Sequence, residues 1–253
     1  TGDSVNAYYG VDTAGAWAGS STNHPFKLHT NNTERLRIDS SGRLLINTTS
    51  SKAAGGVTAD LQIEGTSTGS LRITRNASDA APPHLIFSKS GGTSIGSNTT
   101  VDDDDNLGRI RFCGADGTDH ASIGAEISAA VDGTPGSNDI PSRLVFATTA
   151  DGAASPTERV RITSKGVITA KNGAVAEIDT LTSASTVTPD FAASCNFTLT
   201  LGHDVTLANP SNLTAGQSGS IFLIQDGTGS RTITFGDQYD FAGGTAPTLS
   251  TAA

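Results

Sequence analysis

Methionine is absent from this 253-residue sequence, and large hydrophobic side chains are scarce. Only 35% of the residues are hydrophobic and 5% are aromatic, with a single tryptophan, Trp17. Deep apolar clefts are lined mainly by hydrophobic and aromatic side chains, so this composition argues against a large core that encloses an active site. The sequence starts at Thr1, without an initiator methionine, and we therefore expect it to be part of a longer protein.

Cysteine, basic clusters and long apolar runs are also lacking. Cys113 and Cys195 are too few for a disulfide framework and have no metal-binding spacing, so we expect two free, buried thiols, with a disulfide as the alternative. No run approaches the roughly 20 apolar residues of a membrane-spanning helix, and no signal peptide begins the sequence, which predicts no membrane insertion. The net charge is −9 without a basic stripe, which argues against nucleic acid as the main partner.

Short strand patterns separated by turn-forming residues fill most of the sequence, whereas amphipathic helical periodicity is hard to find. The sequence therefore predicts an all-β fold of hairpin-rich modules. The segments with strand patterns are residues 26–29, 35–39, 43–47, 61–64, 70–75, 84–88, 108–112, 143–148, 159–163, 167–170, 197–201, 204–208, 220–225 and 231–235.

One stretch occurs twice, as TERLRIDSSG at residues 33–42 and as TERVRITSKG at residues 157–166. Each copy predicts a strand, a tight turn containing Ser and Gly, and a second strand. Because successive side chains of a strand point to opposite faces, the aliphatic residues should face inward and the arginines outward. We expect Glu and Arg to pair across strands or chains. The residues expected to face inward are Leu36, Ile38, Val160 and Ile162, and those expected to face outward are Arg37 and Arg161.

Hairpins of this kind bury few side chains each, so a single chain of them is expected to be barely stable by itself. A fully buried aliphatic side chain contributes about 1.5 to 3 kcal/mol, against about 1 to 2 kcal/mol to order each residue's backbone. Stacked repeats or identical chains would supply the missing surface. We therefore expect an elongated oligomer with three parts: residues 1–55 with the first hairpin repeat, residues 56–171 as a central β-rich module, and residues 172–253 as a C-terminal β-sandwich-like unit.

The sequence of residues 107–168 resembles a module of tail-fibre and related virion proteins of tailed bacteriophages, especially marine phages. GADGTD, VDGTPG, RLVFATTADG and PTERVRI occur there in that order. Residues 23–50 resemble the shorter repeat of the same proteins, and residues 186–235 resemble a β-rich unit near their C-termini. The resemblance covers most of the sequence from residue 23 onward.

The resemblance implies a homotrimeric, β-rich structural protein of the virion, assembled in the cytoplasm of the bacterial host. Its partners would be its own copies, other phage tail or capsid proteins and a host surface receptor, and its role would be to attach to the host cell or to link a fibre to the particle. Two features depart from the relatives. The self-cleaving chaperone domain of many relatives is not seen, and the sequence ends at residues 247–253, where relatives continue into another strand.

Few residues suggest chemistry, and we assign no catalytic, cofactor-binding or metal site from the sequence. Asp102 to Asp105 are four consecutive carboxylates and could bind Ca²⁺, but they lack the spacing of a calcium loop, so a solvated loop is expected. The Asp-rich loops at residues 114–119 and 131–139 are expected to be turns.

Residues 92–96, GTSIG, match a serine-hydrolase pattern without the helix that such a nucleophile requires. Five scattered histidines are expected to be surface or strand residues rather than an axial metal site: His24, His29, His84, His120 and His203.

Two alternative functions remain open beside that of a tail fibre. A fibre-borne polysaccharide depolymerase would need two carboxylates across a groove and aromatic platforms for sugars. Among the large polar rings, Tyr8, Tyr9 and Trp17 lie together near the start, and we expect them to pack against a neighbouring chain; Tyr239 lies apart from them. The other alternative is a capsid decoration or adaptor protein. We expect a non-enzymatic protein without cofactors.

Overall fold

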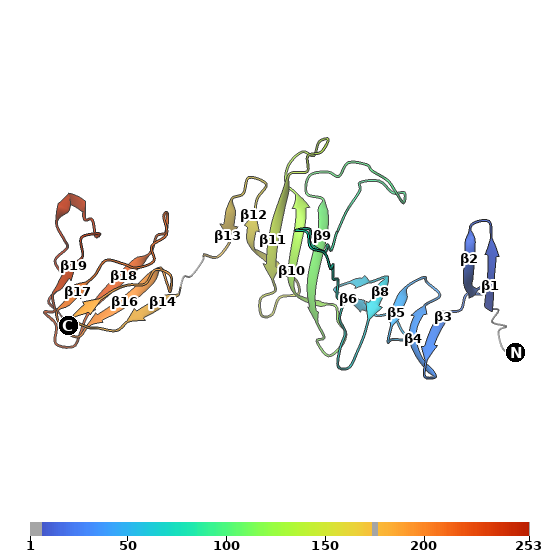
Figure 1. The fold of residues 1–253 in the computed structure, drawn as a ribbon, viewed down its shortest axis with the longest axis horizontal. Helices are drawn as coiled ribbons and strands as arrows, with labels where there is room; N and C mark the ends of the chain where they lie inside the picture. Colours follow the sequence, from blue (N-terminus) through green and yellow to red (C-terminus); the bar gives the residue numbers. More distant parts are fainter. Residues whose placement is uncertain (1–6, 174–176, 253) are drawn as a thin grey trace. The chain divides into compact units, whose positions relative to one another are not determined.

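The computed structural model describes residues 7–173 and 177–252, and almost all of its regular structure is β-strand. The predicted all-β class is therefore confirmed. The chain divides into two compact units, Thr1–Asn172 and Gly173–Ala253 (Figure 1). Among the described residues, the only helical segment is a 3-10 turn, Ala242–Gly244, and no helix there has the length and hydrophobicity needed to cross a membrane. The division into three parts stays a prediction.

The first unit begins with a hairpin and a small mixed sheet. Strands β1 and β2 form the hairpin, and β3, β4, β5 and β8 form a four-stranded sheet in that order. Asn31 and Asn32 connect β3 to β4, and both have positive φ angles, as a two-residue hairpin turn requires. The bounds are β1 Ala7–Asp12, β2 Gly15–Ser20, β3 Phe26–Thr30, β4 Thr33–Ile38, β5 Leu44–Ile46, β6 Ala53–Ala54, β7 Val57–Thr58 and β8 Leu61–Ile63.

A five-stranded antiparallel sheet completes the first unit. Its order is β13-β12-β11-β10-β9, so each strand lies beside its neighbour in sequence and β9 and β13 are the edges. Strand β10, next to the edge strand β9, is the longest, and its small residues gave no clear strand pattern in the sequence. The bounds are β9 Asn106–Gly114, β10 Ser122–Val131, β11 Ser142–Thr148, β12 Thr157–Ile162 and β13 Ile168–Ala170.

Two strands predicted from the sequence are not formed in this chain. Residues 70–75 and 84–88 show the alternation of a strand but are irregular, because no neighbouring strand pairs with either segment. The prediction of strands at these positions was wrong for the single chain. The other predicted segments all overlap observed strands.

The second unit consists of two parallel sheets, β14-β16-β18 and β15-β17-β19. Successive strands alternate between the sheets, so each pair of strands forms one coil of a β-solenoid. Two sheets that enclose one core agree with the sandwich-like expectation, although the strands within each sheet run parallel. The bounds are β14 Ile178–Leu181, β15 Thr186–Val187, β16 Asn196–Leu201, β17 Val205–Leu207, β18 Ser220–Gln225 and β19 Ile233–Phe235.

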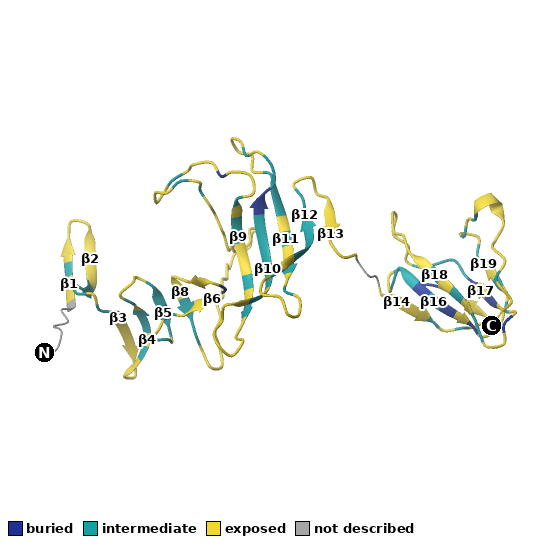
Figure 2. Ribbon diagram, turned by 180° about the vertical axis from the view of Figure 1, so that it is seen from behind, coloured by how far each residue is buried: buried dark blue, intermediate teal, exposed yellow. Residues whose placement is uncertain are grey.

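The core of the second unit arises from strict alternation in its middle coil. In β16 and β17 the apolar residues are buried while the threonines between them are exposed or half-buried, as Figure 2 shows by the dark blue on these strands. Thr206 and Thr234 form an outer ladder with an Oγ1–Oγ1 distance of 3.0 Å. The buried cluster consists of Val187, Leu199, Leu201, Val205 and Leu207.

Candidate functional surfaces

The repeated stretch forms the same structure in both places, including an irregularity in the same position. In β4, Glu34 pairs with His29 and Leu36 pairs with Leu28, so Arg35 is an extra residue, a β-bulge. In β12, Arg159 is the extra residue in the same way. The side chains of both bulge arginines donate from Nε to a threonine hydroxyl of the preceding strand at 2.9 Å. The repeat is thus a reused structural unit.

The bulge brings Glu and Arg together within one strand. Residues three apart in a regular strand point to opposite faces, but the extra residue places Glu34 and Arg37 on the same side. Arg37 donates from Nη2 to Glu34 at 2.7 Å, and Arg161 donates from Nε to Glu158 at 2.7 Å. In each pair a second hydrogen bond joins the guanidinium to the other carboxylate oxygen. The expectation of pairs across strands or chains was therefore wrong.

These pairs lower the pKa of both glutamates. The hydrogen bond from Arg37 is the main cause for Glu34, and the hydrogen bond from Arg161 is the main cause for Glu158. A lysine lies 3.6 Å from each glutamate and contributes in the same direction; these are Lys27 on the adjacent strand β3 and Lys171 directly after β13. The arrangement stabilises charge in the folded sheet, and nothing about it resembles a pair of catalytic carboxylates.

We expect the Glu34→Gln/Glu158→Gln double variant to be less stable than the natural chain at neutral pH, and we expect this difference to shrink in acid. Because the folded-state pKa of each glutamate is lowered, its contribution is present above the ordinary pKa of 4.5 and is lost as the pH falls through the folded value. Urea unfolding at pH 7 and pH 3 measures the difference. Glu64→Gln, whose partner Lys52 lies 3.7 Å away at an exposed position, is the control and should change little.

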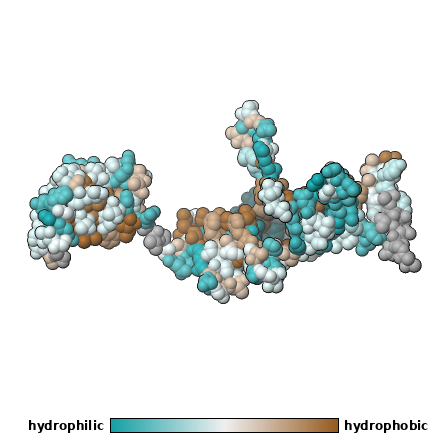
Figure 3. Space-filling view, turned by 90° about the horizontal axis from the view of Figure 1, so that it is seen from below, coloured by the Kyte–Doolittle hydropathy of each residue, from teal (hydrophilic) through white to brown (hydrophobic). Residues whose placement is uncertain are grey.

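The five-stranded sheet has one apolar and one polar face. The cross-strand partners Ile110 and Ile127, Ile127 and Phe146, and Phe146 and Val160 align apolar side chains across four strands. Hydrophobic residues gather on this part of the molecule in Figure 3. The apolar face is open to solvent in the single chain at Ile110, Phe112, Leu144, Phe146 and Ile168, with Ile168 70% exposed.

The four-stranded sheet shows the same asymmetry. Leu36 and Ile38 lie on one face and Arg37 on the other, so the predicted separation of aliphatic from arginine side chains is confirmed there and in β12. In the single chain, however, Ile38 is 43% exposed while the Arg37 side chain is only 13% exposed. The aliphatic face is thus the uncovered one, and the prediction that the aliphatic residues face inward and the arginines outward is wrong for this sheet of the single chain. Leu28 and Leu61 are exposed on the same face.

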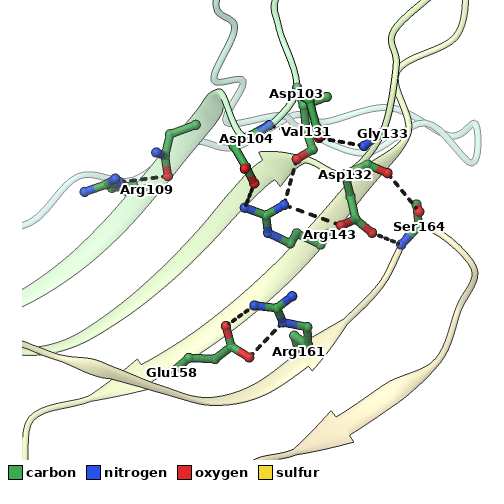
Figure 4. A network of polar contacts seen from close by, with 11 residues as sticks. Asp103, Asp104, Arg109, Val131, Asp132, Gly133, Arg143, Glu158, Arg161 and Ser164 are labelled. Carbon is green, nitrogen blue, oxygen red and sulfur yellow. Dashed lines mark hydrogen bonds and ion pairs between the residues drawn. The ribbon is translucent and has the colours of Figure 1, made fainter.

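A polar network fixes the loops at one end of the five-stranded sheet. Arg143 donates to Asp104 at 2.6 Å and to the carbonyl oxygen of Val131 at 2.9 Å, and it lies 3.4 Å from Asp132 (Figure 4). Asp132 accepts a hydrogen bond from the backbone N–H of Ser164 at 2.9 Å, and that contact is the first cause of its lowered pKa. The network connects the loop before β9 to the turns β10–β11 and β12–β13.

The Asp102–Asp105 loop belongs to this network. Asp103 accepts a hydrogen bond from the backbone of Gly133 at 2.8 Å, and Asp105 forms an ion pair with Lys89. No group of three or more side chains suited to a metal ion occurs among residues 7–173 and 177–252. In the loop at residues 114–119, Asp116 accepts hydrogen bonds from Thr118 and Asp119, as in an Asx turn. These acidic residues therefore organise the loops.

The remaining sequence candidates are separate from one another. GTSIG at residues 92–96 lies in a loop that a Gly91–Thr99 backbone hydrogen bond closes, and no helix follows it in the described chain. His24 contacts Thr22 at 2.9 Å, and His29 lies opposite Glu34 in the sheet. Cys113 and Cys195 are free, as expected, and half-buried rather than buried.

The aromatic residues near the start lie on the β1–β2 hairpin, which the sequence did not predict as strands. The ring centroids of Tyr8 and Trp17 are 6.3 Å apart, and Gly10 opposite Trp17 leaves room for the indole ring. Tyr9 and Val11 are highly exposed. Tyr239 instead packs on the core of the second unit and donates a hydrogen bond to the carbonyl oxygen of Ala208 at 3.1 Å.

Comparison with known proteins points to one class. Residues 187–253 match the family described as "Putative phage tail fibre C-terminal domain". This match confirms the resemblance to tail-fibre proteins of bacteriophages and supports a structural, virion-associated role. A search of curated proteins gives no match.

Two solved structures of the bacteriophage T5 L-shaped tail fibre are similar to the chain. The first, its carboxy-terminal domain, has a TM-score of 0.46 and 12% identity, covering 70% of this chain and 81% of that one. The second includes the intramolecular chaperone domain and has a TM-score of 0.48 and 15% identity, covering 65% of this chain and 50% of that one.

Proposed function

We propose that the protein is a homotrimeric structural component of a phage tail fibre, which attaches the particle to a host cell or links the fibre to the particle. The open apolar face of the five-stranded sheet carries the proposal of self-association. A sheet that leaves most of its apolar face open needs a partner, and we propose a second copy of this chain, which carries the same apolar face.

The energetics favour covering this face. Each aliphatic or aromatic side chain that becomes fully buried contributes about 1.5 to 3 kcal/mol. The five exposed residues of the face are large, and three sheets that meet around an axis would form one core from three identical surfaces. The arginines lie on the opposite face of the sheet, where they stay in contact with water and with their glutamates.

The native mass of the full chain over a concentration series tests self-association. Three chains per particle are expected, and a monomer at all concentrations would contradict the proposal. Immunogold labelling of intact phage particles tests the location in the virion. Label on the tail supports a fibre, whereas label confined to the capsid would favour a decoration or adaptor protein.

A further inference from the structure

Residues 65–90 belong to the long connection between β8 and β9 and lack backbone pairing. Within the described chain, no backbone–backbone hydrogen bond involves this stretch. The stretch is nevertheless not polar like an ordinary loop. Leu71 is 65% exposed, and Ile73, Leu85, Ile86 and Phe87 are exposed as well. The alternation of residues 70–75 together with exposed apolar side chains is the pattern of a strand without a partner.

The pattern of residues 70–75 is that of strands which are paired elsewhere in the same chain. Leu71, Arg72 and Ile73 alternate as the corresponding residues do at 36–38 in β4 and 160–162 in β12. Both β4 and β12 are hydrogen-bonded on their two sides. The same alternation at 71–73 indicates a strand with one apolar and one polar face, for which this chain supplies no neighbour.

The first unit also has an unpaired edge. β9 is a nine-residue edge strand, the longest of the edge strands in the described sheets. Two side chains of the preceding connection contact this region: Phe87 packs against Gly108, where a Cβ atom would lie 2.7 Å from the Phe87 Cβ, and Lys89 pairs with Asp105, just before β9. In the described sheets no strand pairs with the outer side of β9, so its edge from Arg109 to Gly114 lacks a strand partner.

We propose that residues 70–75 of one copy add as a β-strand to the open edge of β9, Arg109–Gly114, in a second copy. This inference rests on the proposed self-association. It places Leu71 and Ile73 beside Ile110 and Phe112, so the apolar face continues from one chain into the next. Arg72 then lies on the polar face, where the charge of Arg111 is compensated by Glu126 at 2.9 Å.

The geometry of exchange is consistent with a closed ring. Each copy offers one strand and one edge, and these are different surfaces, so contacts between copies run head to tail. Every strand and every edge then has a partner only if the copies form a closed ring. Three copies that surround a common apolar core satisfy this condition, and the exchange would then connect every chain to both neighbours.

Hydrogen exchange of the full chain, read by mass spectrometry, tests the proposal. The assembled protein is compared with monomeric Phe146→Glu and Ile168→Glu chains, in which a carboxylate disrupts the apolar face. We expect amides of residues 70–75 and the outward amides of β9 to exchange at least about tenfold more slowly in the assembly than in the monomers. Arg72→Pro removes a backbone N–H donor of the added strand. It should raise the chain concentration at which half of the assembly dissociates at least about tenfold, and Ser78→Pro should not.

Three results overturn the proposal and are distinguishable. An assembly in which residues 70–75 or the β9 edge exchange rapidly would overturn the strand exchange and leave self-association intact. Equal protection in the monomers would show pairing within one chain. A natural chain that is monomeric at every concentration would overturn both the exchange and the self-association on which it rests.

Discussion

Replacement of Phe197 by alanine is expected to lower the free energy of unfolding of the second unit by about 3 to 5 kcal/mol. Phe197 is 0% exposed in the middle strand β16, and its ring centroid lies 5.3 Å from that of Phe191. Whole domains have stabilities of about 5 to 15 kcal/mol, so this loss removes a large part of the total. Amide exchange of β16 during urea unfolding reports on this unit specifically.

Phe222→Ala is the matched control for Phe197→Ala. Phe222 lies on the adjacent strand β18 but points outward and is 51% exposed. A surface substitution of this kind should change stability by less than about 1 kcal/mol in the monomeric unit. Equal losses for the two variants would mean that the inward and outward faces of the solenoid have been assigned incorrectly.

Phe146→Glu is expected to abolish the proposed trimer at concentrations where the natural chain assembles. Phe146 lies in the middle of the apolar face, between Ile127 and Val160 on the adjacent strands. A carboxylate buried there without a partner costs several kcal/mol, and about 2.7 kcal/mol already corresponds to a hundredfold weaker association. Native mass over a concentration series measures the shift of the trimer to monomers.

Val145→Glu tests whether the effect belongs to the face rather than to the strand. Val145 precedes Phe146 in β11, points to the polar face and lies opposite Arg161. A carboxylate at this position meets a guanidinium group and should leave assembly intact. If both variants assemble normally, the apolar face is not the interface, and if both fail, the strand itself has been disrupted.

Alternation and turn residues made much of the first unit predictable. The strands of the repeated unit and the turns between them were found from sequence, since Gly42 and Gly166 adopt the positive φ angles that close these turns. The separation of Arg37 from Leu36 and Ile38 followed from strand geometry alone. No catalytic or metal site was predicted, and the acidic loop that was expected to be solvated is exposed at Asp102 to Asp104, with additional ion pairs to Arg143 and Lys89.

Other features escaped prediction because their cause lies outside the local sequence. β10 is rich in Ala, Ser and Gly and has little strand propensity, but β9 and β11 pair with it on both sides. Residues 70–75 show the opposite case, in which a clear strand pattern has no neighbour within the chain. The bulges at Arg35 and Arg159 depend on register with the preceding strand, so the Glu–Arg pairs they create were predicted between strands instead of within one.

The sequence by itself determined that this protein is an all-β chain with one-sided strands, tight turns and a repeated hairpin. These properties depend on backbone geometry over a few residues, which the side-chain pattern specifies directly. Only the tertiary structure decided which strands pair, that the second unit is a parallel solenoid, and that the apolar faces of the first unit are left open. Those outcomes depend on which distant segments meet, and the segments that meet none within the chain, residues 70–75 and the edge of β9, are the ones we assign to a second copy.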